Sequence, residues 1–185
     1  MAETAGKQNQ ALLSLGANIE PERNLPRAVS ALSSFGRVVR VSRVWETMPY
    51  GPPGQPVFLN AALWLETPLS APELKSAISE VETALGRLRS ANRFAPRPID
   101  IDIIFFNDDI LQLGQRRVPD REALERPFVA IPLAEIAPGY IHPGTGDTLA
   151  AIATRFAPAE AGMFLRNDVQ LLSPGLSESK GVGSR

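Results

Sequence analysis

The segment that most constrains the fold is "RFAPRPIDIDIIFF", residues 93–106. It ends in an apolar run typical of a buried strand, yet Asp100 and Asp102 interrupt that run two positions apart. Because side chains alternate along a strand, the neighbouring isoleucines would face a core and both aspartates the opposite side. An unpaired buried carboxylate costs several kcal/mol, so the side that carries the aspartates must offer water or cations.

The composition bounds the class of protein. With 185 residues, 44% of them hydrophobic, the chain is long enough for one globular domain with a sizeable core. We expect that domain at residues 11–171, between a loose tail at 1–10 and a disordered tail at 172–185. No run of eighteen apolar residues offers a membrane span and the N-terminus lacks a secretory signal, which predicts a cytoplasmic protein.

The net charge and the scarcity of cysteine and histidine argue against several functions. The chain has no cysteine and one histidine, His142, which disfavours disulfides, thiolate or multi-histidine metal centres and a Ser-His-Asp triad. A bound metal would therefore be a hard, oxygen-ligated cation such as magnesium. The formal net charge of -1 gives no general attraction to nucleic acid or to an anionic membrane, so we expect neither as a partner.

Strand-like and helix-like segments alternate along the chain. Apolar or β-branched runs predict strands at 11–16, 37–45 and 57–66, and the opening segment supplies a fourth. One helix is expected to follow Asn24 as N-cap and to end before Gly36; another follows the capping-box spacing of "SAPE" at 70–73. This order predicts an α+β fold: a ferredoxin-like split βαβ core, with a mostly antiparallel sheet, helices on one face and an open active-site face.

Arginines cluster just before the two aspartates. Four of them fall within eleven residues: Arg87, Arg89, Arg93 and Arg97. A D-x-D pattern alone fits an exposed pair on an open sheet, and arginines at a helix end often only satisfy carbonyls. Together, however, guanidinium forks and carboxylate-held magnesium are what polyphosphate transfer needs, and no P-loop motif is present to hold phosphates instead.

These residues resemble the 6-hydroxymethyl-7,8-dihydropterin pyrophosphokinases of folate biosynthesis. The signature "RFAPRPIDIDI" is similar to the family pattern R-W/F-G-P-R-x-x-D-x-D-[IL]. Further similar segments are "LSLGAN" at 13–18, "ETMPYGPPGQPVFLNAA" at 46–62, "LGR" at 85–87 and "RPFVAIPLAEIAP" at 126–138. The resemblance implies a diphosphokinase: ATP gives its β,γ-diphosphate to the hydroxymethyl oxygen of the pterin and leaves as AMP.

The resemblance also implies roles for individual residues. Asp100 and Asp102 would bind two magnesium ions, and Arg87 and Arg97 would contact the triphosphate and stabilise charge during transfer. The implied pterin contacts are Thr47, the backbone near Tyr50, Asn60, and Phe58 with Phe128 as a sandwich around the ring. The implied ATP contacts are Glu82, Arg87, Arg89, Phe94, Arg97, Ile103, Arg117, Asp120 and Arg126. We further expect a monomer whose loops at 47–56 and 87–97 close over the substrates.

Three positions depart from the family pattern. Asp120 stands where the family often has a histidine near the nucleotide phosphates, and we expect Arg117 or Arg121 to balance its charge. Ala95 replaces a usual glycine, and Met48 a common proline. Two alternatives stay open: another two-metal enzyme such as a nucleotidyltransferase, which would release pyrophosphate, and a non-catalytic relative that binds pterin or nucleotide.

Overall fold

The computed structural model describes residues 8–49, 54–88 and 95–171. Its main sheet has six strands in the order β5-β1-β4-β3-β8, with β2 also paired to β4, and every pairing is antiparallel. The strands are β1 Asn9–Ala17, β2 Arg37–Val41, β3 Trp45–Thr47, β4 Phe58–Thr67, β5 Asp100–Phe106 and β8 Phe164–Leu165. A separate hairpin pairs β6 Leu111–Leu113 with β7 Arg116–Val118.

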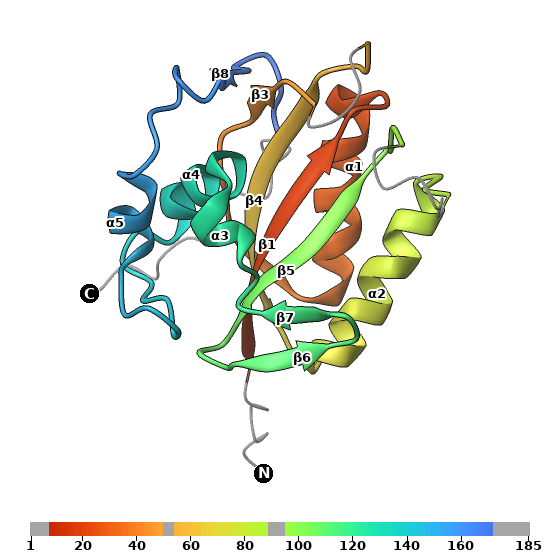
Figure 1. The fold of residues 1–185 in the computed structure, drawn as a ribbon. Helices are drawn as coiled ribbons and strands as arrows, with labels where there is room; N and C mark the ends of the chain where they lie inside the picture. Colours follow the sequence, from red (N-terminus) through yellow and green to blue (C-terminus); the bar gives the residue numbers. More distant parts are fainter. Residues whose placement is uncertain (1–7, 50–53, 89–94, 172–185) are drawn as a thin grey trace, which may run out of the picture.

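Two long helices cover one face of the sheet. α1 (Pro21–Leu32, followed by the 3-10 turn Ser33–Phe35) and α2 (Ala71–Ala84) lie on the same side in Figure 1. Their apolar stripes pack on alternate residues of β1, β4 and β5 in one buried cluster. In this cluster are the predicted inward residues Leu59, Ala61, Leu63, Leu65, Ile99, Ile101 and Ile103. The α+β class is confirmed, and the strand period assigns both faces of β4 as expected.

The second face is open only in part. The short helices α3 (Glu122–Glu125), α4 (Pro127–Ile136) and α5 (Leu149–Ala153) lie on it in Figure 1, and α4 contacts β4 and β1. They bury Leu12, Ala62, Ile104 and Phe105 of the sheet. These side chains are apolar and would otherwise face water, so the sheet needs this cover. The part of the face that carries Asp100 and Asp102 lies outside this second core.

A bulge breaks the alternation of β5 after Ile103. Leu13 is opposite Ile103, but Leu12 is opposite Phe105, so Ile104 has no partner residue of its own in β1. As a result Ile104 and Phe105 both join the second core, while Phe106 returns to the first. The alternation expected for Ile99 to Ile103 therefore holds, and it ends at the bulge.

Two local expectations are wrong. The strand expected at 37–45 is two strands, β2 and β3, because the Ser42 hydroxyl oxygen between them accepts the Ala62 backbone N–H at 2.8 Å. The first helix begins at Pro21, so Asn24 is a buried residue inside it rather than its N-cap. The Asn24 side-chain amide instead donates to the Ile19 carbonyl at 2.8 Å. The capping box at Ser70 is confirmed, since Glu73 accepts the Ser70 backbone N–H at 2.8 Å.

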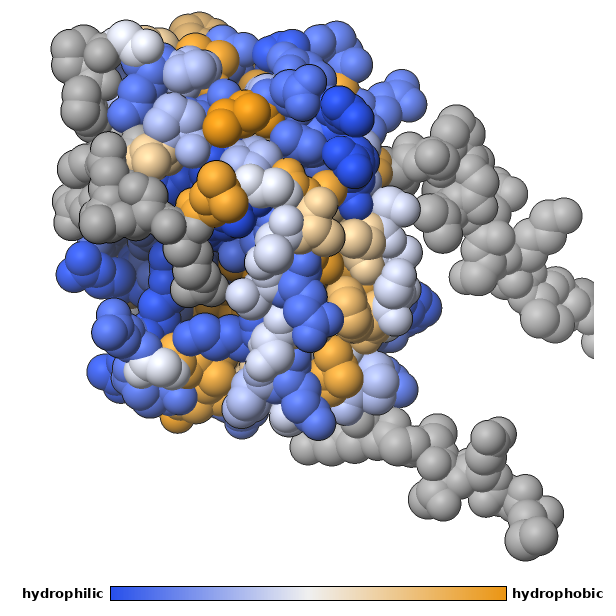
Figure 2. Space-filling model, turned by 90° about the vertical axis from the view of Figure 1, so that its right-hand side faces the viewer, coloured by the Kyte–Doolittle hydropathy of each residue, from blue (hydrophilic) through white to orange (hydrophobic). Residues whose placement is uncertain are grey.

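None of the described helices is long and apolar enough to cross a bilayer. Figure 2, which shows the side of α2, has hydrophilic residues over most of the surface and hydrophobic ones in separate patches.

His142, buried beside the second core, offers a test of this packing. Its ring meets the Phe105 ring edge-on at 5.3 Å between centroids, and its Nδ1 accepts the N–H groups of Gly144 and Thr145 at 3.0 and 3.2 Å. Burial lowers the pKa of His142 below its usual value of 6.5. The folded protein therefore binds this proton less tightly than the unfolded chain, and stability from neutral His142 is lost as the pH falls below about 6.5.

We predict that His142→Asn costs stability at pH 7.5 and that the cost shrinks by pH 5.5, as measured by urea unfolding. Because the sequence has a single histidine, its ring proton signals in an NMR pH series report its folded pKa without ambiguity. A pKa at or above 6.5, or a stability difference that does not change with pH, would contradict the assignment.

Candidate active site

The end of α2 presents two functional side chains together. Gly86 has φ +90°, the left-handed conformation that ends many helices. The Gly86 N–H donates to the Thr83 carbonyl at 3.0 Å, and the Arg87 N–H donates to the Glu82 carbonyl at 2.9 Å. This pair of bonds is a Schellman motif, and it turns the chain so that Arg87 lies back against Glu82. Their side chains form an ion pair.

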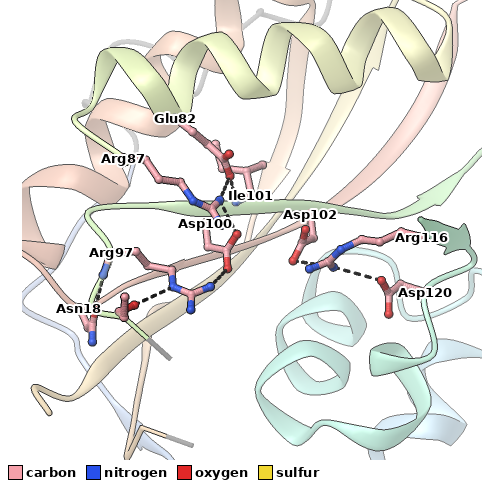
Figure 3. Close-up of polar contacts among 10 residues, drawn as sticks. Asn18, Glu82, Arg87, Arg97, Asp100, Ile101, Asp102, Arg116 and Asp120 are labelled. Atoms are coloured by element: carbon pink, nitrogen blue, oxygen red, sulfur yellow. Dashed lines mark hydrogen bonds and ion pairs between the residues drawn. The ribbon is translucent and has the colours of Figure 1, made fainter. Parts of the chain in front are cut away.

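Glu82 and Arg87 connect α2 to the strand that carries the aspartates. Glu82 Oε1 accepts the Ile101 backbone N–H of β5 at 2.8 Å, and Arg87 Nη1 donates to Asp100 Oδ1 at 2.6 Å (Figure 3). Burial raises the pKa of Glu82, while the Ile101 N–H and Arg87 act against that rise. Since β5 is an edge strand, Glu82 satisfies a backbone donor that no neighbouring strand would accept.

Arg97 approaches Asp100 from the other side. Its Nη1 donates to Asp100 Oδ2 at 2.5 Å, so the two arginines bind the two oxygens of one carboxylate. The backbone around Arg97 is held by Asn18: the Asn18 Oδ1 accepts the Arg97 N–H at 2.7 Å, and the Asn18 N–H donates to the Arg97 carbonyl at 3.1 Å. The segment before β5 is thereby attached to the end of β1 (Figure 3).

Asp102 pairs with a third arginine. Arg116 of β7 places Nη1 2.9 Å from Asp102 Oδ2 and 3.2 Å from Asp120 Oδ2 (Figure 3). Burial, together with the negative charge of Asp100, raises the pKa of Asp102 to about 7, although Arg116 acts to lower it.

A cavity of about 710 Å³ follows the outer edge of β5. α2, the arginine segment before β5 and the β6–β7 hairpin form its walls, with Glu82, Arg87, Arg97, Asp100, Asp102, Ile103 and Arg116 among the lining residues. Lys75 of α2 donates from Nζ to the Leu113 carbonyl of β6 at 2.7 Å and so attaches the hairpin to the helix. The volume is in the range of small-molecule sites, and the walls carry charges of both signs.

The oxygen ligands in this cavity suit a magnesium ion whose remaining coordination positions are taken by a polyanion such as a polyphosphate. Asp100 and Asp102 offer oxygen ligands on one face of β5, as hard cations require. Within the described residues, no three or more His, Cys, Asp or Glu side chains are grouped so as to hold a metal ion. Phosphate oxygens and water would complete the six oxygens that Mg²⁺ takes. The raised pKa of Asp102 fits a group whose ionised form a dication would stabilise.

A second, smaller pocket of about 160 Å³ lies at the other implied substrate position. Thr47, Phe128 and Met163 are among its lining residues. The Asn60 amide donates to Thr47 Oγ1 at 2.9 Å, and β3–β4 pairing places Thr47 opposite Phe58. Asn60 is buried on the same face of β4 as Phe58, next to Gly16, where a Cβ would approach Asn60 Oδ1 to 3.3 Å. Enclosure of a pterin between Phe58 and Phe128 stays a prediction.

Tyr50, Arg89 and Phe94 are outside the described residues. Arg126 is the N-cap of α4, and Arg117 is an exposed residue of β7 that does not line the 710 Å³ cavity. The expected pairing of Asp120 with Arg117 or Arg121 is wrong: Arg116 pairs with Asp120, and Arg121 pairs with Glu125. Sequence reasoning missed Arg116, although alternation in β7 puts Arg116 and the buried Val118 on one face.

The fold and the site together define a class. An antiparallel α+β domain without a P-loop, whose edge strand carries two carboxylates among arginines, has the chemistry of a phosphate-transferring enzyme that holds its nucleotide by side chains. A family model described as 7,8-dihydro-6-hydroxymethylpterin-pyrophosphokinase (HPPK) matches residues 12–138. The chain belongs to this family.

Curated relatives agree over most of the chain. A Synechocystis protein named 2-amino-4-hydroxy-6-hydroxymethyldihydropteridine pyrophosphokinase is 34% identical over 89% of this chain and 89% of its own length. A Bacillus subtilis protein of the same name is 40% identical over 69% of this chain and 78% of its own.

Among solved structures, wild-type Plasmodium falciparum HPPK-DHPS has the same fold. The TM-score is 0.63 at 15% identity, over 83% of this chain. The chain spans 45% of that longer protein.

The Schellman motif after α2 predicts a measurable cost for replacing its glycine. At Gly86 and at Gly139 an added Cβ would meet nothing within 4 Å, but only Gly86 has a positive φ. We expect Gly86→Ala to lower the free energy of unfolding by about 1–2 kcal/mol, since an L-residue is strained in the left-handed region. Gly139→Ala is the matched control and should change it by less than about 0.5 kcal/mol in the same urea titration. Equal effects would show that the backbone at Gly86 is unstrained for alanine.

Proposed function

We propose that this protein transfers the diphosphate group of ATP to 6-hydroxymethyl-7,8-dihydropterin, releasing AMP and the pterin diphosphate. Membership of the family supports the reaction. The observation that carries it is the convergence of Arg87 and Arg97 on Asp100, beside Asp102, in a cavity of about 710 Å³. A monomeric state and a cytoplasmic location are further proposals that rest on the sequence.

The nucleotide would lie along the edge of β5. Arg87 and Arg97 carry planar guanidinium groups that match phosphate oxygens, and they reach the cavity from opposite sides of Asp100. Bound triphosphate would attract these arginines away from Asp100 and so expose its carboxylate to a cation. Glu82, held by the Ile101 N–H, would keep Arg87 oriented throughout.

Asp100 and Asp102 would hold the cations, with two magnesium ions as the proposed number. Mg²⁺ bound there supplies positive charge that offsets repulsion between the polyphosphate and the incoming hydroxyl oxygen. The chain itself contributes positioning and charge: arginines bind the group that moves, and the walls of the cavity limit access of water.

The pterin would occupy the pocket of Thr47 and Phe128. The Asn60 amide is oriented by Thr47 Oγ1 and by the Trp45 carbonyl, to which its Nδ2 lies at 3.4 Å. An amide fixed in this way can recognise a ring edge that offers both donors and acceptors. Phe128 would supply an apolar ring surface on the α4 side.

The structure weakens the reason for a non-catalytic reading. Asp120 was the feature that favoured it, because an unbalanced carboxylate would repel triphosphate. Arg116 lies 3.2 Å from Asp120, so Asp120 is paired with a cation of the site. Asp100 and Asp102 are both present on the face expected of cation ligands.

The nucleotide product tests the reaction. With Mg-ATP and 6-hydroxymethyl-7,8-dihydropterin, we expect AMP and the pterin diphosphate in equal amounts, separated by anion-exchange chromatography. Release of ADP or pyrophosphate would contradict the proposal, as would absence of turnover beside an active family member assayed in parallel.

The cation ligands are tested by substitution. Asp100→Ala and Asp102→Ala should each lower kcat by at least about a thousandfold, the scale of losing a main electrostatic contribution to transfer. Asp108→Ala, in the exposed turn after β5, removes the same charge nearby and should keep the parent rate. Circular dichroism checks that all three variants fold. Near-parent kcat for either site variant at saturating magnesium would refute the ligand assignment.

A further inference from the structure

Arg116 is bound to two carboxylates through one nitrogen. Its Nη1 is 2.9 Å from Asp102 Oδ2 and 3.2 Å from Asp120 Oδ2, and the side chain is 49% exposed (Figure 3). The guanidinium thus bridges a residue of β5 and a residue that follows β7. Asp102 is the proposed cation ligand, whereas Asp120 has had no role in the proposed transfer.

The two carboxylates are not held equally. Asp120 is the more buried, with a side chain 10% exposed against 21% for Asp102. Its Oδ1 accepts the Glu122 N–H at 3.0 Å, and its backbone N–H donates to the Ile104 carbonyl at 3.0 Å. These bonds fix Asp120 so that Oδ2 remains directed at Arg116. Arg116 can therefore leave Asp102 and stay bound to Asp120 with only a small movement.

Arg116 Nη1 lies 2.9 Å from Asp102 Oδ2, an oxygen atom that a divalent cation bound to Asp102 would also use. Mg²⁺ binds carboxylate oxygen directly at about 2.0–2.1 Å, which excludes a guanidinium from the same lone pair. Arg87 and Arg97 form ion pairs with Asp100 in the same way. In the proposed function, both arginines leave Asp100 and bind phosphate. Arg116 is the corresponding cation of Asp102, and Asp120 is an alternative partner for it within the protein.

We propose that Arg116 and a divalent cation compete for Asp102, and that Asp120 is the positioning residue that accepts Arg116 when the cation binds. The inference rests on the cation site of the proposed function. It explains why an acid can stand at position 120 beside a polyphosphate: it retains an arginine at the wall of the cavity. Once released from Asp102, the guanidinium of Arg116 would have N–H donors for phosphate oxygens in the cavity that it lines.

Binding of Mn²⁺ without nucleotide tests the competition, because it needs no turnover. The amount of free Mn²⁺ is measured by electron paramagnetic resonance as metal is added to the parent and to each variant. We expect Arg116→Gln to bind Mn²⁺ about threefold to fivefold more tightly, the size expected from removing a partly exposed ion pair. Arg121→Gln is the matched control: it removes the same charge next to Asp120, from a side chain that is 83% exposed, and should leave the affinity unchanged.

A double-mutant cycle tests whether Asp120 acts by accepting Arg116 or only through the attraction of its negative charge for the cation. Asp120→Asn should weaken Mn²⁺ binding in the parent about threefold, because Arg116 then has only Asp102 as a partner, but by less than about 1.5-fold in Arg116→Gln. If charge alone acts at a distance, Asp120→Asn weakens binding by the same factor in both backgrounds, and that result overturns the proposal. Arg116→Met keeps the aliphatic stem and should match Arg116→Gln; urea unfolding shows that each variant is folded.

The remaining outcomes are also decisive. If Asp102→Asn abolishes Mn²⁺ binding while Arg116→Gln and Arg121→Gln bind like the parent, the cation site stands and only the competition is refuted. If no form binds Mn²⁺ alone, the same comparisons are made with a non-hydrolysable ATP analogue present, and if no form binds Mn²⁺ then either, the proposed cation ligands and the competition fail together.

Discussion

The site depends on how the carboxylates of an edge strand are balanced by arginines from three other segments. β5 has an outer edge that no strand pairs with and acidic side chains on one face, a combination that is costly without partners. Arg87 after α2, Arg97 before β5 and Arg116 on β7 each pair with one of the two aspartates. Because their charges are those that a nucleotide and its cations would also satisfy, the same network holds the fold and can bind substrate.

The local signals of α2 place this network accurately. The capping box at Ser70 sets where the helix begins, and Gly86 sets where it ends. Between these ends the apolar stripe fixes which side faces the sheet, so Glu82 meets the Ile101 N–H of β5. The position of Arg87 thus follows from signals within one short stretch of sequence, whereas its role in binding triphosphate stays a prediction from the family resemblance.

The second face shows the limit of pattern reasoning. Alternation correctly directs Asp100 and Asp102 to one face and Ile99, Ile101 and Ile103 to the other. It fails at Ile104, where a bulge inserts an extra residue, because the run is apolar on both faces and nothing in its period marks the break. For the same reason the helices α3 to α5, which cover Ile104 and Phe105, were not expected on a face predicted to be open.

By itself, the sequence determined the fold class, the faces of β4 and most of β5, both long helices, and the grouping of Arg87 and Arg97 with the two aspartates. Periodicity, caps and a long motif specify these, and each acts over a few residues. Only the tertiary structure decided which arginine balances Asp120. Arg116, Arg117 and Arg121 carry the same side chain and are close in sequence. Of the three, Arg116 alone pairs with Asp102 and Asp120. This follows from the side of β7 on which Arg116 lies and from the packing of the hairpin against β5.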